Sequence, residues 1–83
     1  MELVIFAGFE IDAASAEVLK TIDYNTHDLE FDAHEKKDRM FTLWYSRRIN
    51  DKRGRCIDTE LLFSCSEPTA AAAFHRLAQE IKV

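Results

Sequence analysis

The feature that most constrains the fold of this chain is an alternating run of apolar and polar residues from Met40 to Arg48. A turn over residues 50–54 follows it, and a second alternating run extends from Ile57 to Cys65. Because successive side chains of a strand point to opposite faces, two such runs joined by a short turn predict a half-buried antiparallel hairpin. Gly54 can supply the positive φ that a tight turn requires.

The residues before this hairpin predict two further strands and a helix. Residues 2–11 are mostly apolar and predict one strand, in which Gly8 marks a bulge or the strand's end. Asp12 stands where an N-cap belongs, and apolar residues at helical spacing predict a short amphipathic helix over 13–22. Residues 28–33 alternate acidic and apolar side chains, which predicts a strand with one acidic face, and residues 35–39 form a charged turn.

A second helix is expected at the end of the sequence. Ser66 can cap it, and Pro68 is tolerated in a first helical turn. Its core-facing stripe consists of Ala70, Ala73, Phe74, Leu77, Ala78 and Ile81. The expected fold is therefore one small α+β domain over residues 1–83, with the order β-α-β-β-β-α. Its antiparallel sheet carries two helices packed on one face.

The register of the hairpins predicts what surrounds Trp44. Because a core face must pair with a core face, the turn over 50–54 sets Leu43 opposite Leu61 and Trp44 opposite Glu60. The turn over 35–39 sets Glu30 opposite Trp44 from the other side. The pattern thus predicts a tryptophan on the face away from the core, ringed by carboxylates.

An exposed tryptophan among carboxylates favours a docking surface for a basic partner, since tryptophan is enriched in interface hot spots and charge steers association. The candidate partner-binding residues are Glu30, Asp32, Trp44, Asp58, Glu60 and Leu62. We hypothesise a small cytoplasmic module that regulates or inhibits another protein by covering its basic surface. A concrete version is a phage-type inhibitor of a nucleic-acid-handling complex, as an anti-CRISPR would be.

The charge distribution supports an alternative function. The net charge is −4, yet residues 39–55 hold six basic residues against one acidic residue. Five of these bases cluster around the turn and can contact phosphates, which makes a nucleic-acid-binding domain the alternative. The candidate residues are Arg47, Arg48, Lys52, Arg53 and Arg55.

The order β-β-β-α, ending in the alanine-rich helix of residues 69–74, loosely resembles double-stranded-RNA-binding domains. In that family, lysines at the start of the last helix grip the phosphates. Here those positions read Ser66-Glu67-Pro68-Thr69, so the contact that the resemblance implies is replaced by an acidic segment.

The two cysteines are predicted on one strand. Cys56 and Cys65 are nine residues apart in sequence, which separates them by about 30 Å and rules out a disulfide between them. Free thiols suit a reducing cytoplasm. The apolar start of the chain is too short for a secretory signal and no apolar run is long enough to span a bilayer, so no membrane association is expected.

The sequence predicts neither an enzyme nor a metal or cofactor site. The three histidines, His27, His34 and His75, fall on different parts of the expected fold. Asp58 and Glu60 share a strand face, but it is an open, wet sheet without a pocket to separate their pKa values. A third class remains open beside the two above, a homo-oligomer (in its simplest form a homodimer) that pairs through a free strand edge or through the apolar patch around Trp44.

Overall fold

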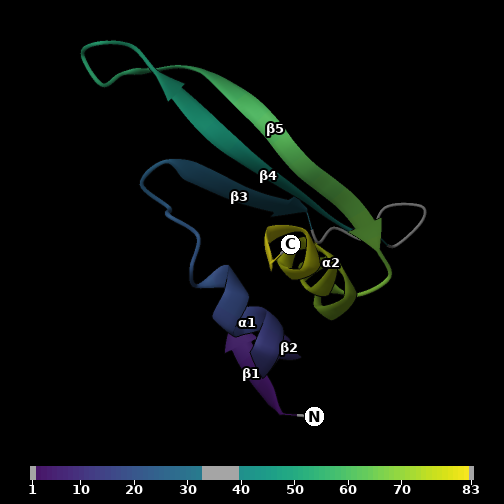
Figure 1. Cartoon of the computed structure of the whole chain (residues 1–83). Helices are drawn as coiled ribbons and strands as arrows, with labels where there is room; N and C mark the ends of the chain where they lie inside the picture. Colours follow the sequence, from purple (N-terminus) through teal and green to yellow (C-terminus); the bar gives the residue numbers. More distant parts are fainter. Residues whose placement is uncertain (1, 33–39, 83) are drawn as a thin grey trace.

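The computed structural model describes residues 2–32 and 40–82 (Figure 1). Its elements are β1 (Leu3–Phe6), β2 (Phe9–Asp12), α1 (Ala13–Leu19), β3 (His27–Asp32), β4 (Phe41–Asn50), β5 (Cys56–Glu67) and α2 (Ala70–Lys82). The α+β class is confirmed. The predicted turn over 35–39 and His34 lie outside the described residues.

The prediction of one strand over residues 2–11 is wrong, because β1 and β2 form a tight antiparallel hairpin of their own. The residues between them are Ala7 and Gly8, with φ of 53° and 87°. Two consecutive positive φ values are typical of the two-residue turn whose twist matches that of paired strands. The order is therefore β-β-α-β-β-β-α, with a two-stranded sheet β1-β2 beside a three-stranded sheet β3-β4-β5.

Helix α1 begins as predicted, with the Asp12 carboxylate accepting the Ser15 backbone N–H at 2.9 Å. It ends at Leu19 rather than at residue 22. Part of the reason is local competition for its last carbonyls, since the Thr21 hydroxyl donates to the Val18 carbonyl at 2.6 Å. Ile22 remains buried although it lies beyond the helix.

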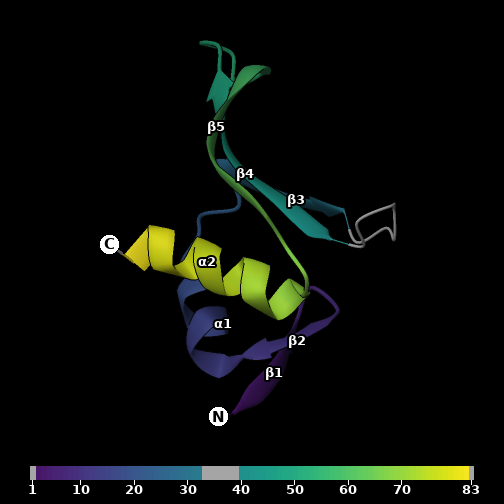
Figure 2. The same ribbon diagram turned by 90° about the vertical axis from the view of Figure 1, so that its right-hand side faces the viewer.

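The second helix lies in the middle of the molecule. Figures 1 and 2 show α2 between the three-stranded sheet on one side and β1, β2 and α1 on the other. Helix α1 packs on α2 and on the first hairpin, and of the two described helices only α2 packs on the three-stranded sheet. Both helices were expected on one sheet face. That expectation is wrong because α1 directly follows β2 and stays with its hairpin.

The apolar stripe of α2 is confirmed, with Ala73, Phe74, Leu77 and Ala78 buried. The cap is Thr69 rather than Ser66, since the Thr69 hydroxyl accepts the Ala72 N–H at 3.1 Å. Ser66 belongs to β5, where its hydroxyl pairs with that of Thr42.

Phenylalanine rings join the two sheets around α2. Phe74 of α2 makes an edge contact with Phe6 of β1 at a centroid distance of 5.4 Å and a tilted contact with Phe41 of β4 at the same distance. Phe9 of β2 reaches the Phe41 ring at 5.1 Å. Aromatic pairs at these distances add to the stability gained from burial, so they hold the first hairpin against the three-stranded sheet.

The β4–β5 hairpin extends well past β3 (Figure 1). Strand β3 pairs with β4 only over residues 42–47, whereas β4 and β5 pair out to Asn50 and Cys56. Residues 48–59 therefore form a largely two-stranded projection, which we call the arm.

Candidate functional site

The candidate site is the face of the three-stranded sheet turned away from α2, which we call the outer face. Because directly paired residues share a face, the register assigns eleven residues to it. These are Asp28, Glu30 and Asp32 of β3, Thr42, Trp44, Ser46 and Arg48 of β4, and Thr59, Leu61, Ser64 and Ser66 of β5. Trp44 is 39% exposed there.

The predicted surroundings of Trp44 are half correct. Glu30 lies opposite Trp44 on β3, as predicted. On β5, however, Trp44 pairs with Ser64 instead of Glu60, and Leu43 pairs with Cys65 instead of Leu61. The ladder shifts twice, between Tyr45 and Ser46 and between Ile49 and Asn50. Each shift adds one residue to β5, and the pair beside the turn is Asn50 with Cys56, so the turn spans 51–55 rather than 50–54. Together these differences displace the partner of Leu43 from Leu61 to Cys65.

The shifts also relocate the two acidic residues of β5. Glu60 pairs with Arg47, and its carboxylate accepts two hydrogen bonds from that guanidinium, the shorter at 2.7 Å. Asp58 lies opposite Ile49. Both partners alternate with the outer-face residues of β4, so Asp58 and Glu60 belong to the opposite face of the hairpin and do not ring Trp44.

The same shift exposes apolar residues that were expected in the core. Phe63 and Cys65 face the core as predicted, but Leu62 is the extra residue of the ladder, so the alternation changes sides there. Leu61 is consequently 59% exposed on the outer face, and Leu62 beside it is 42% exposed. Ile57, also predicted in the core, is 65% exposed on the arm.

The acidic side chains of the outer face come from β3. Glu30 makes no hydrogen bond or ion pair within the described part of the chain. Asp28 lies 3.5 Å from Nε of Arg48, whose Nη2 donates to the Tyr24 carbonyl at 2.6 Å. Among the described residues, the carboxylate nearest to Trp44 along the ladder is therefore unpaired, and Arg48, the cation that the register assigns to the outer face, is already bound.

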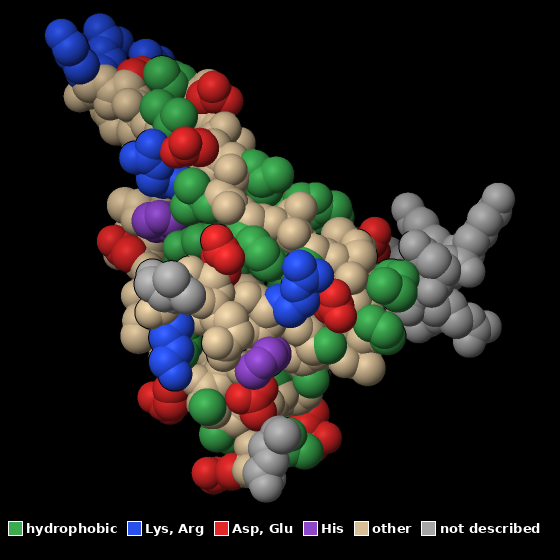
Figure 3. Space-filling model, turned by 45° about the vertical axis from the view of Figure 1, so that its right-hand side comes forward, with side chains coloured by type: hydrophobic (Ala, Val, Ile, Leu, Met, Phe, Trp, Pro, Cys, Tyr) green, Lys and Arg blue, Asp and Glu red, His purple; other side chains and the backbone are tan. Residues whose placement is uncertain are grey.

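Basic side chains gather at the end of the arm, and hydrophobic and acidic side chains lie along its length (Figure 3). Three of the five candidate phosphate-binding residues are engaged internally. Arg47 binds Glu60 and Arg48 binds Asp28, as described above, and Arg55 Nε lies 3.1 Å from Asp51. Lys52 and Arg53 are left without a side-chain partner among the described residues.

Asp51 organises the turn at the end of the arm. Its carboxylate accepts the backbone N–H groups of Arg53 and Arg55, both at 2.9 Å. The hydrogen bond from the Arg55 backbone is the main reason that the pKa of Asp51 lies below its usual value. The Asp51 carboxylate thus holds the turn together, and its negative charge offsets part of the positive charge of the basic residues in the turn.

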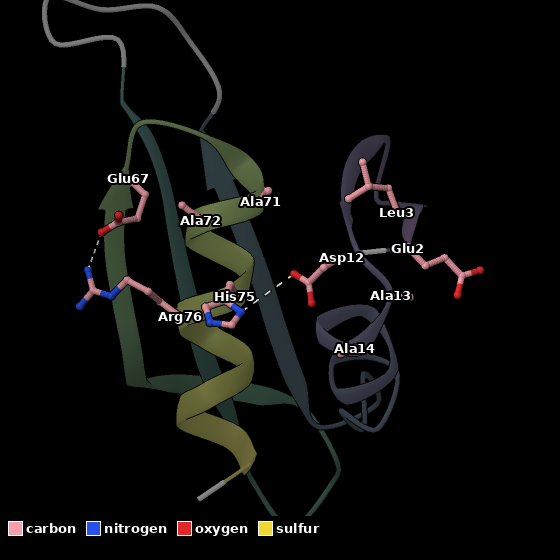
Figure 4. A pocket seen from close by; sticks show the side chains of 10 residues that line it. All are labelled: Glu2, Leu3, Asp12, Ala13, Ala14, Glu67, Ala71, Ala72, His75 and Arg76. Atoms are coloured by element: carbon pink, nitrogen blue, oxygen red, sulfur yellow. Dashed lines mark hydrogen bonds and ion pairs between the residues drawn. The ribbon is translucent and has the colours of Figure 1, made fainter.

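An open groove of about 890 Å³ lies between α2, β1 and the start of α1 (Figure 4). Its lining consists of Glu2, Leu3, Asp12, Ala13, Ala14, Glu67, Ala71, Ala72, His75 and Arg76. Its polar groups are largely engaged with one another. Arg76 donates to Glu67 at 2.8 Å, and Nδ1 of His75 lies 4.0 Å from Asp12 and 3.3 Å from the Ser15 hydroxyl. We assign no chemistry to this groove.

The remaining reactive side chains lie apart. The His27 ring stacks on Tyr45 in β4, whereas His75 lies on α2. Cys56 is exposed and Cys65 is buried; both are free thiols on β5, as predicted. Burial raises the pKa of the Cys65 thiol. Within residues 2–32 and 40–82, no group of three or more histidine, cysteine, aspartate or glutamate side chains is arranged to hold a metal ion.

No protein-family model, curated protein or solved structure matches this chain. The described helices are all too short or too polar to cross a bilayer.

Proposed function

We propose that the protein is a binding module that regulates or inhibits another protein by covering a basic surface with its outer face. One observation carries the proposal: a sheet face without a covering helix among the described elements presents Trp44 together with Leu61 and Leu62. Tryptophan anchors surrounded by apolar contacts are typical of interface hot spots. The hairpin shift at Leu62 supports the proposal, because it brings Leu61 to the outer face beside Leu62, which was predicted there and is exposed.

The charges of the outer face favour a basic partner. Among the described residues, Glu30 is an outer-face carboxylate without an ion-pair partner, and Arg48, the arginine that the register assigns to this face, already binds Asp28. A free carboxylate beside an exposed indole suits an arginine or lysine side chain, which can lie over the ring while its charge meets Glu30. Basic surfaces are common in nucleic-acid-handling complexes, so a phage-type inhibitor of such a complex remains the concrete version of the proposal.

The nucleic-acid alternative has weaker support. Phosphate binding draws its free energy from cations that release counterions, and three of the five candidate cations are already paired with carboxylates inside the molecule. The arm also carries exposed Ile49 and Ile57, which fit a protein contact better than a phosphate backbone.

The experiment that tests the proposal captures binding proteins from a lysate of the native host with three immobilised variants. The wild type and a double variant, Lys52→Glu with Arg53→Glu, are expected to retain the same nuclease-resistant protein. Glu30→Lys is expected to lose it, because the new cation repels a basic partner. If Glu30→Lys retained the captured protein while the double variant Lys52→Glu with Arg53→Glu lost it, the proposal would be overturned. Nucleic-acid binding through the arm would then be favoured.

A further inference from the structure

Strand β5 is an edge strand, since the sheet order is β3-β4-β5. The direction of its backbone groups follows from one hydrogen bond. The Arg48 N–H donates to the Thr26 carbonyl on the β3 side at 2.9 Å. Because antiparallel partners alternate in direction, the even-numbered residues of β4 face β3 and the odd-numbered ones face β5.

This alternation assigns the free edge of β5. Thr59, Leu61 and Ser64 lie opposite Arg48, Ser46 and Trp44, respectively. Their backbone N–H and C=O groups therefore point away from β4, along the edge that no described strand covers. Edge groups of this kind are a template for another strand.

One of these outward groups is already satisfied. The Thr59 N–H donates to the Asp58 carboxylate at 2.8 Å. No such side-chain hydrogen bond covers the Leu61 or Ser64 N–H within the described residues. The open part of the edge thus lies next to the outer face, on the two residues that pair with Ser46 and Trp44.

The side chains beside this edge define what can fill it. On the outer face β5 presents Leu61 and Thr59, and on the opposite face it presents Asp58 and Glu60. A strand that pairs with the free edge of β5 would place its side chains alternately beside the outer-face residues and beside those of the opposite face. A basic residue complements Asp58, whose carboxylate has no ion-pair partner among the described residues, since Glu60 is already bound by Arg47. An apolar residue complements Leu61.

A second copy of this chain fits the edge poorly. All charged side chains of β5 are acidic, namely Asp58, Glu60 and Glu67. Glu60 and Glu67 are paired with Arg47 and Arg76, so Asp58 is the β5 carboxylate without an ion-pair partner among the described residues. A second β5 strand carries no basic residue to pair with Asp58, and it would add carboxylates beside it, where like charges are destabilising. The charge pattern therefore favours a different chain as the occupant.

We infer that the free edge of β5 around Leu61 and Ser64 binds an extended segment of the partner, with alternating basic and apolar residues, as an added strand. The inference rests on the proposed function, since it names the part of the partner that docks beside Trp44. An incoming lysine or arginine competes for the Asp58 carboxylate and so frees the Thr59 N–H for the new ladder.

The test titrates the whole chain with a short peptide of alternating lysine and valine and follows backbone amide exchange by NMR. With about nine-tenths of the sites occupied, exchange at Leu61 and Ser64 is expected to slow about tenfold, because only the unoccupied fraction exchanges. A matched peptide of alternating glutamate and valine is expected to leave both amides unchanged. Unchanged exchange with the lysine peptide, or equal protection by both peptides, would overturn the inference. Protection that grows with protein concentration alone would overturn it in favour of a second copy.

Variants separate this inference from the proposed function. Asp58→Lys is expected to weaken protection by the lysine peptide, whereas Glu80→Lys, an exposed change on α2, is the matched control and leaves it intact. Ser64→Pro removes an outward N–H that β4 does not use, so the hairpin is expected to persist. If Ser64→Pro still captures the partner while Trp44→Ala does not, the inference fails and the proposed function stands.

Discussion

Asp12 shows how one side chain links three elements at the residue level. It ends β2, caps α1 through Ser15 and lies 4.0 Å from His75 of α2. Burial opposes its ionisation, but the hydrogen bonds from Ser15, the backbone N–H of Asp12 and the charge of His75 together outweigh that penalty. They hold the pKa of Asp12 below its ordinary value of 3.8.

Asp12→Ala is expected to lower the free energy of unfolding by about 1 kcal/mol at neutral pH, the usual cost of losing an N-cap. Urea denaturation followed by circular dichroism measures this. The exposed substitution Glu17→Gln in the same helix is the control and should change stability by less than about 0.5 kcal/mol. An equal effect of the two substitutions would contradict the capping role.

The lowered pKa also sets a pH dependence. A carboxyl group whose pKa is lower in the folded state stabilises the fold above its unfolded pKa, and this contribution is lost as the pH falls through the folded value. Stability from Asp12 should thus be present at neutral pH and disappear below pH 3.8. Asp12→Asn, which keeps a capping oxygen, is expected to show a weaker loss between neutral and acidic pH in the same assay. If the stability of Asp12→Asn fell with pH as much as that of the wild type, the pH dependence assigned to Asp12 would be wrong.

Leu43 and Trp44 are neighbours in sequence on opposite faces of β4. Leu43 is fully buried and Trp44 is 39% exposed. Leu43→Ala is expected to cost about 3 kcal/mol of stability and Trp44→Ala about 1 kcal/mol. Chemical denaturation followed by circular dichroism compares the two. A larger loss in Trp44→Ala would place Trp44 in the structural core rather than on a binding face.

At the level of elements, the first hairpin stores strain in its turn. Ala7 adopts a φ of 53°, a conformation that costs an L-residue roughly 1–2 kcal/mol, whereas Gly8 at 87° adopts its φ without that cost. Asn-Gly is the preferred pair for this turn, and the Ala-Gly found here is not.

Ala7→Asn is therefore expected to raise the free energy of unfolding by about 0.5–1 kcal/mol, since asparagine tolerates positive φ better than alanine. Gly8→Ala should lower it by a similar amount, although a Cβ at Gly8 meets open space. Thermal and urea denaturation of both variants test the pair. Stabilisation by Gly8→Ala would contradict the turn geometry.

Local patterns predicted those elements whose signal lies within one stretch of sequence. The Asp12 cap, the α2 stripe and the pairing of Glu30 with Trp44 all follow from spacing alone. The first hairpin was missed because its two strands are short and its turn lacks the usual Asn-Gly signal. The β4–β5 register differs from the prediction because β5 contains two extra residues, Ile57 and Leu62, and because the turn spans residues 51–55. Both extra residues are apolar, so the sequence pattern does not mark them.

At the scale of the whole molecule, the position of α2 decides which surface is free. It lies between the first hairpin and the three-stranded sheet, so it buries one sheet face and leaves the other exposed (Figure 2). The outer face with Trp44 and the exposed Leu62 could be predicted from alternation. The presence of Leu61 on this face and the absence of Asp58 and Glu60 from it could not. Those differences arise from the ladder shifts rather than from any local preference.

The central claim is that the outer face binds a protein, and capture from native-host lysate with and without nuclease tests it most directly. Wild type is compared with Trp44→Ala and with Ile5→Ala, whose side chain is 70% exposed on β1. We expect a nuclease-resistant protein that is retained by wild type and Ile5→Ala and lost by a folded Trp44→Ala. A partner retained by Trp44→Ala, or one that disappears with nuclease, would contradict it.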